Sequence, residues 1–108
     1  MVDDEVQVLK CLGRLLRRRG FEVRTTTSPR EALELLRAAP ADVVIADFMM
    51  PEMTGTELLD EVGRLDPQVR RVLLTGYADL ESGGGPAVGV HLVSKPWDVD
   101  ELMRRCLE

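Results

Sequence analysis

The sequence predicts an α/β fold in which an open parallel sheet carries helices on both of its faces. Three continuous apolar runs, at 42–47, 70–75 and 90–94, are too short for helices and suit strands buried on both faces. Segments with apolar residues at helical spacing lie before and between these runs. Strands that alternate with helices favour parallel pairing with right-handed crossover connections.

Length and composition are typical of one cytoplasmic domain. The chain has 108 residues and 44% hydrophobic content, so we expect a single domain spanning 1–108 with no separate output domain. No apolar run reaches the roughly 18 residues that a membrane span requires. The acidic start "MVDDE" also lacks the basic and apolar regions of a signal peptide.

Charge and cysteine content exclude further classes of function. A formal net charge of -5 argues against direct nucleic-acid binding, and the basic run "RLLRRRG" suits the exposed C-terminal end of a helix. Cys11 and Cys106 lie far apart in helical patterns and lack the spacing of a zinc site or a redox pair. We therefore expect both thiols to be reduced packing groups.

The chain begins with a predicted helix and a predicted strand. Apolar residues recur at helical spacing over about 5–19 and stop at Gly20, which marks the C-terminal boundary of the helix. "FEVRTTT" at 21–27 follows as a strand, because apolar and polar residues alternate and threonine favours extended backbone.

Three further segments are predicted to be helical. In "SPREALELLRAA", Ser28 is the N-cap, Pro29 takes the first helical position and Glu31 completes a capping box. "GTELLDEVGRL" at 55–65 gathers its apolar residues on one side. A last helix begins near Asp98. With the three apolar runs, these segments complete the alternation.

Polar side chains stand where the predicted strands end. The set is Asp3, Asp4, Asp47, Thr75, Ser94 and Lys95. The carboxyl ends of strands in an open parallel sheet share one edge, and ligands bind in the crevice there. We therefore expect these residues, scattered along the sequence, to converge in space.

Three carboxylates, a hydroxyl and an ammonium together suit phosphoryl transfer. Clustered carboxylates raise one another's proton affinity unless a cation lies among them, and an all-oxygen set without histidine suits Mg²⁺. The Asp47 carboxylate is the expected nucleophile, forming an aspartyl phosphate. Lys95 and the Thr75 hydroxyl would take the remaining phosphoryl oxygens.

Each of these residues also has a purely structural interpretation. "DDE" at 3–5 is a plausible cap for the first helix, Asp47 a turn residue, and Thr75 an ordinary strand end. Packing requires none of these polar groups, and together they stand at successive strand ends. Their joint occurrence favours a functional site.

The sequence resembles the receiver domain of two-component response regulators. The segments that carry the resemblance are "VDDE" at 2–5, "DFMMPEMTG" at 47–55, "LLTGYAD" at 73–79 and "SKPW" at 94–97. They occur in the family's order and span essentially the whole chain. The resemblance implies a flavodoxin-like sheet of five parallel strands in the order 2-1-3-4-5.

The resemblance also assigns roles to the acidic residues. Asp47 corresponds to the phosphoacceptor, which receives its phosphoryl group from a sensor histidine kinase or a phosphotransfer protein. Mg²⁺ would be held by Asp3, Asp4, the Asp47 carboxylate and the backbone carbonyl of Met49. The domain itself would not be an enzyme.

Two further residues complete the expected switch. Thr75 corresponds to the switch hydroxyl and Lys95 to the phosphoryl-binding cation, with a cis bond between Lys95 and Pro96 that aims the ammonium. Phosphorylation would then change the affinity for an output protein, which the sequence does not name. The resemblance leaves homodimerisation open.

The chain departs from the family pattern in three places, one of which is Leu92, where the family commonly has an aromatic residue that moves with the switch. Only Met1 and Val2 precede Asp3, so the first strand is truncated and "FEVRTTT" is expected to be poorly paired. After Tyr77, three consecutive glycines and Pro86 disfavour helix, so the fourth helix is expected to be short or missing.

Two alternative functions remain open from sequence. A degenerate receiver that binds partners without phosphorylation would explain the truncated strand and the weakened fourth helix. A metal-dependent phosphohydrolase also uses an aspartate nucleophile at a strand end, but commonly has a second acid two residues later as general acid. Met49 occupies that position here, which disfavours the hydrolase.

Overall fold

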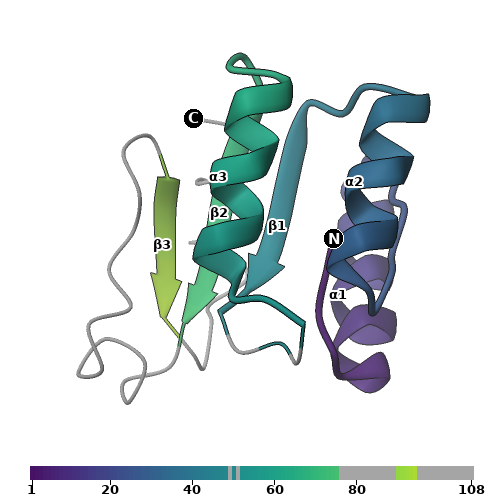
Figure 1. Ribbon diagram of the computed structural model, residues 1–108. Helices are drawn as coiled ribbons and strands as arrows, with labels where there is room; N and C mark the ends of the chain where they lie inside the picture. The colour runs from purple at the N-terminus through teal and green to yellow at the C-terminus, as the bar shows by residue number, and fades with distance from the viewer. Residues whose placement is uncertain (49, 51, 76–89, 95–108) are drawn as a thin grey trace.

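The computed structural model describes residues 1–48, 50, 52–75 and 90–94, and within them three helices surround a three-stranded sheet (Figure 1). The elements are α1 (Val6–Arg18), α2 (Pro29–Ala38), β1 (Val43–Asp47), α3 (Gly55–Leu65), β2 (Arg70–Thr75) and β3 (Val90–Ser94). The strands are parallel and lie in the order β1-β2-β3. The helices and strands predicted within these residues are confirmed, with the exception of the strand at 21–27.

The N-terminal residues extend this sheet beyond β1. Val2 forms isolated parallel bridges with Ala46 of β1 on one side and with Thr26 on the other. The Val2 N–H donates to the Ile45 carbonyl at 2.8 Å, and the Asp47 N–H donates to the Val2 carbonyl at 3.0 Å. The spatial order therefore matches the predicted 2-1-3-4-5, with the first two strands reduced to bridges.

The predicted strand at 21–27 does not form. Within the described residues, this segment pairs with a strand partner only at Thr26, whose N–H donates to the Met1 carbonyl at 3.1 Å. It follows Gly20, whose φ of 95° ends the preceding helix as predicted. Strand geometry needs a neighbouring backbone, and here the neighbour is only a few residues long.

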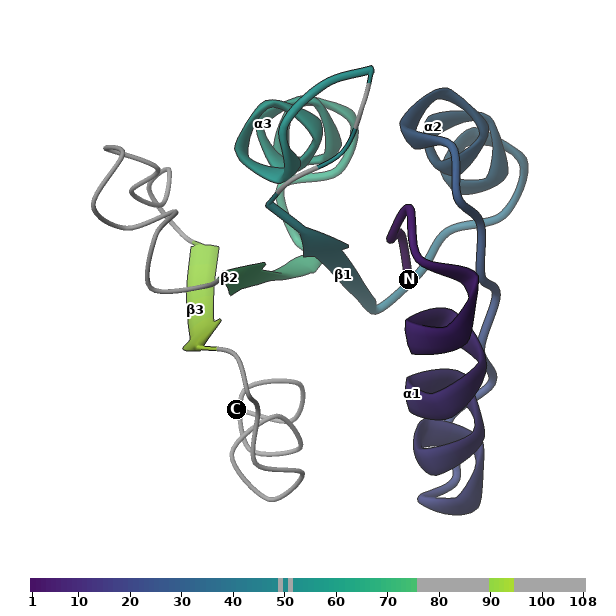
Figure 2. The ribbon, with the colours of Figure 1, turned by 90° about the horizontal axis from the view of Figure 1, so that it is seen from below.

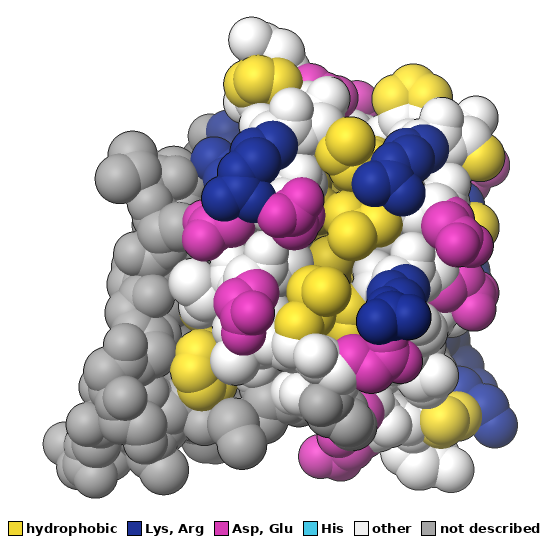
Figure 3. Space-filling view, viewed as in Figure 1, with side chains coloured by type: hydrophobic (Ala, Val, Ile, Leu, Met, Phe, Trp, Pro, Cys, Tyr) yellow, Lys and Arg dark blue, Asp and Glu magenta, His cyan; other side chains and the backbone are white. Residues whose placement is uncertain are grey.

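Helices cover both faces of the sheet, as predicted. Figure 2 shows α2 and α3 on one face and α1 on the other. On the first face, Leu36 of α2 and Leu58 of α3 share a core with Val44 of β1. On the second, Leu12 and Leu16 of α1 pack with residues of β1 and β2. In Figure 3, apolar side chains form a band between α3 and α2, bordered by charged side chains.

The two helices of the first face begin with different caps. The Ser28 hydroxyl accepts from the Glu31 N–H at 3.3 Å, but the Ser28 N–H donates to Thr26 Oγ1 at 3.1 Å, which replaces the return bond of the predicted capping box. At α3, the capping box between Thr54 and Glu57 is complete, although the sequence analysis did not identify it.

The expectations for the cysteines, the C-terminal helices and the membrane are met only in part or lie outside the described residues. Cys11 is reduced, as expected, but exposed on α1 instead of packed. The predicted fourth-helix region after Tyr77, the last helix near Asp98 and Cys106 lie outside the described residues. Within the described part of the chain, no helix combines the length and the apolar character that a membrane span requires.

Candidate functional site

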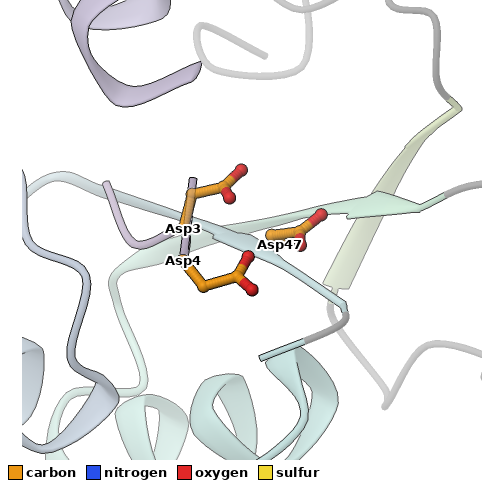
Figure 4. Close-up of side chains that lie close together, drawn as sticks. All are labelled: Asp3, Asp4 and Asp47. Atoms are coloured by element: carbon orange, nitrogen blue, oxygen red, sulfur yellow. The ribbon is translucent and has the colours of Figure 1, made fainter. Parts of the chain in front are cut away.

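Three carboxylates converge at the carboxyl edge of the sheet (Figure 4). Asp3, Asp4 and Asp47 each place a carboxylate oxygen within 4.8 Å of the other two. Asp3 and Asp47 are only 1% and 3% exposed, whereas Asp4 is exposed to solvent. The predicted convergence of the two acidic segments, more than forty residues apart in sequence, is therefore confirmed.

Backbone pairing brings these acids together. Asp47 is the last residue of β1, and its N–H is bonded to the Val2 carbonyl. The Asp3 N–H donates to the Thr26 carbonyl at 3.3 Å on the other side. The short N-terminal segment is thus held between two backbones, and its next residues, Asp3 and Asp4, lie beside the end of β1.

Neither acid of the pair is the N-cap residue of α1. The N-cap of α1 is Glu5, which makes no side-chain capping bond. The Asp3 Oδ1 accepts from the N–H of Glu5, the N-cap residue itself, at 2.9 Å. Nor is Asp47 a turn residue, because it lies in β1 opposite Leu74 of β2. Both structural interpretations are therefore disfavoured.

A glycine fixes the start of α3 against the site. The Gly55 N–H donates to the Phe48 carbonyl at 2.9 Å, which closes the loop that follows Asp47. A Cβ at Gly55 would collide with the Asp47 carbonyl oxygen and lie 2.7 Å from Leu73 Cδ1. From sequence alone, this glycine was recognised only as the last residue of the segment 47–55, and its close contact with Asp47 was not predicted. Gly55 is the first residue of α3, directly after the N-cap Thr54. Most side chains are tolerated at that position, so a glycine there could have indicated a close backbone contact.

The other predicted site residues are placed only in part. Thr75 ends β2, its backbone pairs with that of Ser94 at the end of β3, and β2 adjoins β1. The backbones of Thr75 and Ser94 therefore lie at the same edge as Asp47. Met49, Lys95 and Pro96 lie outside the described residues.

The acidic cluster fits a divalent cation. Its donor set is all carboxylate oxygen, the preference of Mg²⁺ and Ca²⁺. Two of the three carboxylates are buried, where mutual repulsion is screened less than in water. A bound cation would offset that repulsion, and the residues present supply at least three ligand oxygens.

The sequence profile of the response regulator receiver domain family matches residues 1–107 of the chain. This protein belongs to that family. Solved structures agree: a response regulator receiver domain protein from Clostridium thermocellum has a TM-score of 0.85 at 29% identity, over 98% of this chain and 87% of its own. The flavodoxin-like receiver fold and the class of function expected from sequence, a receiver in two-component phosphorelay signalling, are confirmed.

Curated relatives are longer proteins. The chain is 37% identical over 106 residues to the hydrogenase transcriptional regulatory protein HoxA of Cupriavidus necator, covering 95% of this chain and 22% of that protein. It is 35% identical over 104 residues to the regulatory protein AtoC of Escherichia coli, covering 94% of this chain and 23% of that protein. The chain thus spans less than a quarter of either relative.

Proposed function

We propose that this receiver accepts a phosphoryl group on Asp47 from a sensor histidine kinase or a phosphotransfer protein, and thereby changes its affinity for an output protein. The observation that carries the proposal is the position of Asp47. Its carboxylate is buried at a strand end, within 4.8 Å of the carboxylates of Asp3 and Asp4.

The chemistry is a displacement at phosphorus. An Asp47 carboxylate oxygen forms a bond to phosphorus while the phosphorus–nitrogen bond of the donor phosphohistidine breaks, and the histidine, protonated at its other ring nitrogen, leaves as neutral imidazole. Asp3, Asp4 and Asp47 would hold Mg²⁺, together with the Met49 carbonyl. When bound, the cation supplies charge neutralisation for the phosphoryl oxygens.

The response to phosphorylation is assigned to two other residues. The Thr75 hydroxyl and the Lys95 ammonium would bind phosphoryl oxygens, the latter directed by a cis bond to Pro96. What supports this assignment is that Thr75 ends the strand adjacent to β1. The added charge, roughly -1.5 to -2, would then favour one of two packings of the surrounding loops.

We also propose where the receiver acts and what kind of output it controls. Residues 1–108 would act as one cytoplasmic receiver domain that turns over no substrate of its own and binds neither membrane nor nucleic acid directly. The curated relatives are named as regulators, HoxA as a transcriptional one, which supports an output that controls transcription. The mass of the phosphorylated protein in solution, compared with that of the unphosphorylated protein, would show whether two receivers form a homodimer.

Intact-protein mass spectrometry after incubation with acetyl phosphate and Mg²⁺ tests the proposal. We expect one phosphoryl adduct on the wild-type chain, none on Asp47→Asn, and none when Mg²⁺ is chelated. Asp42→Asn is the matched control, because Asp42 is an exposed aspartate at the opposite end of β1, and it should keep the adduct.

Two results would contradict the proposed chemistry. An adduct that persists in Asp47→Asn would place the phosphoacceptor elsewhere. A wild-type chain that stays unmodified, while circular dichroism shows it folded, would favour the phosphorylation-independent interaction module.

A further inference from the structure

The helices α2 and α3 lie side by side on one face of the sheet, and within the described residues no further helix or strand covers them (Figures 1 and 2). Leu33 of α2 shares a core with Leu58 and Val62 of α3. In Figure 3, apolar side chains form a band on the surface between the two helices. Acidic side chains border this band over α3, and basic side chains border it over α2.

Two arginines form the border on α2. Arg30 is directed toward α3, because its guanidinium pairs at 3.6 Å with Glu52, in the loop that leads into that helix. Arg37 follows seven residues later, about two helical turns, and so lies on the same side of α2. Glu34 is two residues from the buried Leu36, about 200° around the helix, and therefore lies on the side away from the sheet.

The border on α3 is formed by an acid and an exposed leucine. Gly63 of this helix faces β2, since a Cβ there would collide with the Arg71 guanidinium. Glu61 and Leu65 are each two residues from Gly63, about 200° around the helix, and so lie on the opposite side, toward α2. Leu65 is 42% exposed, which is unusual for a large apolar side chain beside a core.

The two borders are complementary when this surface meets a second copy of itself. Both helices begin near the carboxyl edge of the sheet and run in the same direction (Figure 1). Rotation by 180° about an axis parallel to them places α2 of one copy on α3 of the other. Arg37 is the ninth residue of α2 and Glu61 the seventh of α3, so their heights along the helices differ by about 3 Å. Each Arg37 would therefore meet the partner's Glu61.

The alternative two-fold axis, perpendicular to the helices, is disfavoured by charge. It would place α2 on α2 and bring arginines of the two copies together, and like charges in contact oppose association. The axis parallel to the helices instead pairs opposite charges twice, once on each side of the band. Charge therefore selects both the occupant of the surface and its orientation.

Existing ion pairs leave these side chains available. Glu61 pairs with Arg64, one turn further along α3, and both side chains are exposed. Such exposed pairs within a helix stabilise little, so Glu61 can also bind a cation of a second copy. Within the described residues, Arg37 makes no ion pair.

We propose that two copies of the chain associate through the surface formed by Arg30, Leu33, Arg37, Glu61 and Leu65, about a two-fold axis parallel to α2 and α3. The contact between Arg37 and Glu61, made twice, sets the orientation, and the partner covers Leu65. Helices about 15 Å long make a small interface, so the dimer is weak and depends on concentration. The contact uses none of the three clustered acids and does not depend on phosphorylation of Asp47.

Sedimentation equilibrium of the full 108-residue chain, at concentrations up to about 0.5 mM, tests the proposal. We expect a wild-type dimer whose dissociation constant rises at least tenfold for Arg37→Glu and for Glu61→Arg, because each change places like charges opposite each other twice. Arg18→Glu is the matched control, since Arg18 is exposed on α1, over the other face of the sheet. It should dimerise like the wild type, and circular dichroism checks that every variant folds.

Mixing the two weakened variants tests the two-fold arrangement. In a mixed dimer, the new glutamate of Arg37→Glu meets the new arginine of Glu61→Arg, and the unchanged Glu61 of the first meets the unchanged Arg37 of the second. Both contacts regain opposite charges, so we expect the mixture to dimerise within about threefold of the wild type. Dimerisation that is lost in each variant and not regained on mixing would overturn the proposed pairing.

The apolar part of the surface has its own variant. Leu65→Ser should raise the dissociation constant at least threefold, because the partner then covers less apolar area. A dimer that neither Leu65→Ser nor Arg37→Glu weakens would lie on another face and would overturn the proposal. A wild-type chain that stays monomeric throughout the concentration range would also overturn it and would leave the surface to a different protein. The phosphoryl adduct on Asp47 is measured separately, so the failure of either proposal leaves the other intact.

Discussion

β1 and the segment 21–27 have similar strand-forming sequences but different structures. "VVIAD" pairs with β2 along its whole length, and Val2 lies on its other side. "FEVRTTT" also contains β-branched and aromatic residues, yet within the described residues it pairs at Thr26 alone. The difference lies in the partner and not in the segment, because strand formation depends on the neighbouring backbone and on packing.

The same contrast extends to the core. Leu58, Leu59 and Leu73, in the core between β1, β2 and α3, are fully buried. A groove of about 640 Å³ lies between β1 and the segment 21–26; Leu36, which lines it, is 9% exposed, and Val23 on its far wall is only half-buried. We therefore expect stability to be concentrated in the β1–β2–α3 half of the molecule.

The largest loss of stability should come from truncating a leucine in the β1–β2–α3 half of the molecule. Leu73→Ala should lower the free energy of unfolding by about 4 kcal/mol, because a close-packed site leaves a cavity. Leu36→Ala should cost about 2 kcal/mol, since its neighbours already border an open groove. Urea unfolding of both variants measures the difference. Equal losses would remove the distinction between the two halves.

Alanine substitutions at two glycines test how closely the backbone is packed, at Gly55 in the β1–β2–α3 half and at Gly13 in α1. Gly55→Ala should cost about 2 kcal/mol, because its Cβ would collide with the backbone carbonyl of Asp47, which cannot move aside as the Leu73 side chain can. Gly13→Ala in α1 is the control, since its Cβ would lie no closer than 3.5 Å to any neighbour. Alanine there should stabilise the helix, by up to about 1 kcal/mol. Thermal unfolding measures both variants. If Gly55→Ala left the melting temperature unchanged, the close contact between residue 55 and the Asp47 carbonyl would be disproved.

The two caps provide a smaller test. Thr54→Ala should destabilise by about 1 kcal/mol, because the complete capping box of α3 loses the bond to the Glu57 N–H and the hydroxyl contact with the Glu57 carboxylate. Ser28→Ala should cost about 0.5 kcal/mol, since its side chain accepts one longer bond from Glu31. Chemical denaturation compares them, and the reverse order would contradict the cap assignments.

The smallest effect concerns pH at the N-terminal edge. Burial, with a smaller contribution from Arg24, lowers the pKa of the Met1 amine from 8.0 to about 6. The unfolded chain therefore takes up a proton near pH 8, before the folded chain does, so stability should fall as pH drops from 8 to 6 and level off below that. Melting temperatures across this range measure the effect. An acetylated N-terminus should remove it, and an identical profile after acetylation would show that other groups are responsible.

Sequence predicted the elements whose signals are local or self-contained. The bounds of α3, β2 and β3 follow from apolar runs and spacing, and the convergence of Asp3, Asp4 and Asp47 follows from the rule that parallel strand ends share an edge. At 21–27, residue preferences predicted a strand that does not form, because they do not record the length of a partner strand. The poor pairing expected from the truncated first strand is confirmed, since within the described residues the segment forms a bridge only at Thr26. The Ser28 capping box failed for a similar reason, since a nearby Thr26 hydroxyl took the N–H.

Val2 joins two backbones, and the acids Asp3 and Asp4 follow it directly in the chain. Any ligand that orders these acids also restrains the pairing of Val2, and anything that restrains that pairing positions the acids. Thermodynamic reciprocity requires the two effects to be equal in free energy. Cation affinity at the acidic edge therefore reports on the pairing of Val2, and a calcium or magnesium titration would measure that pairing from a distance.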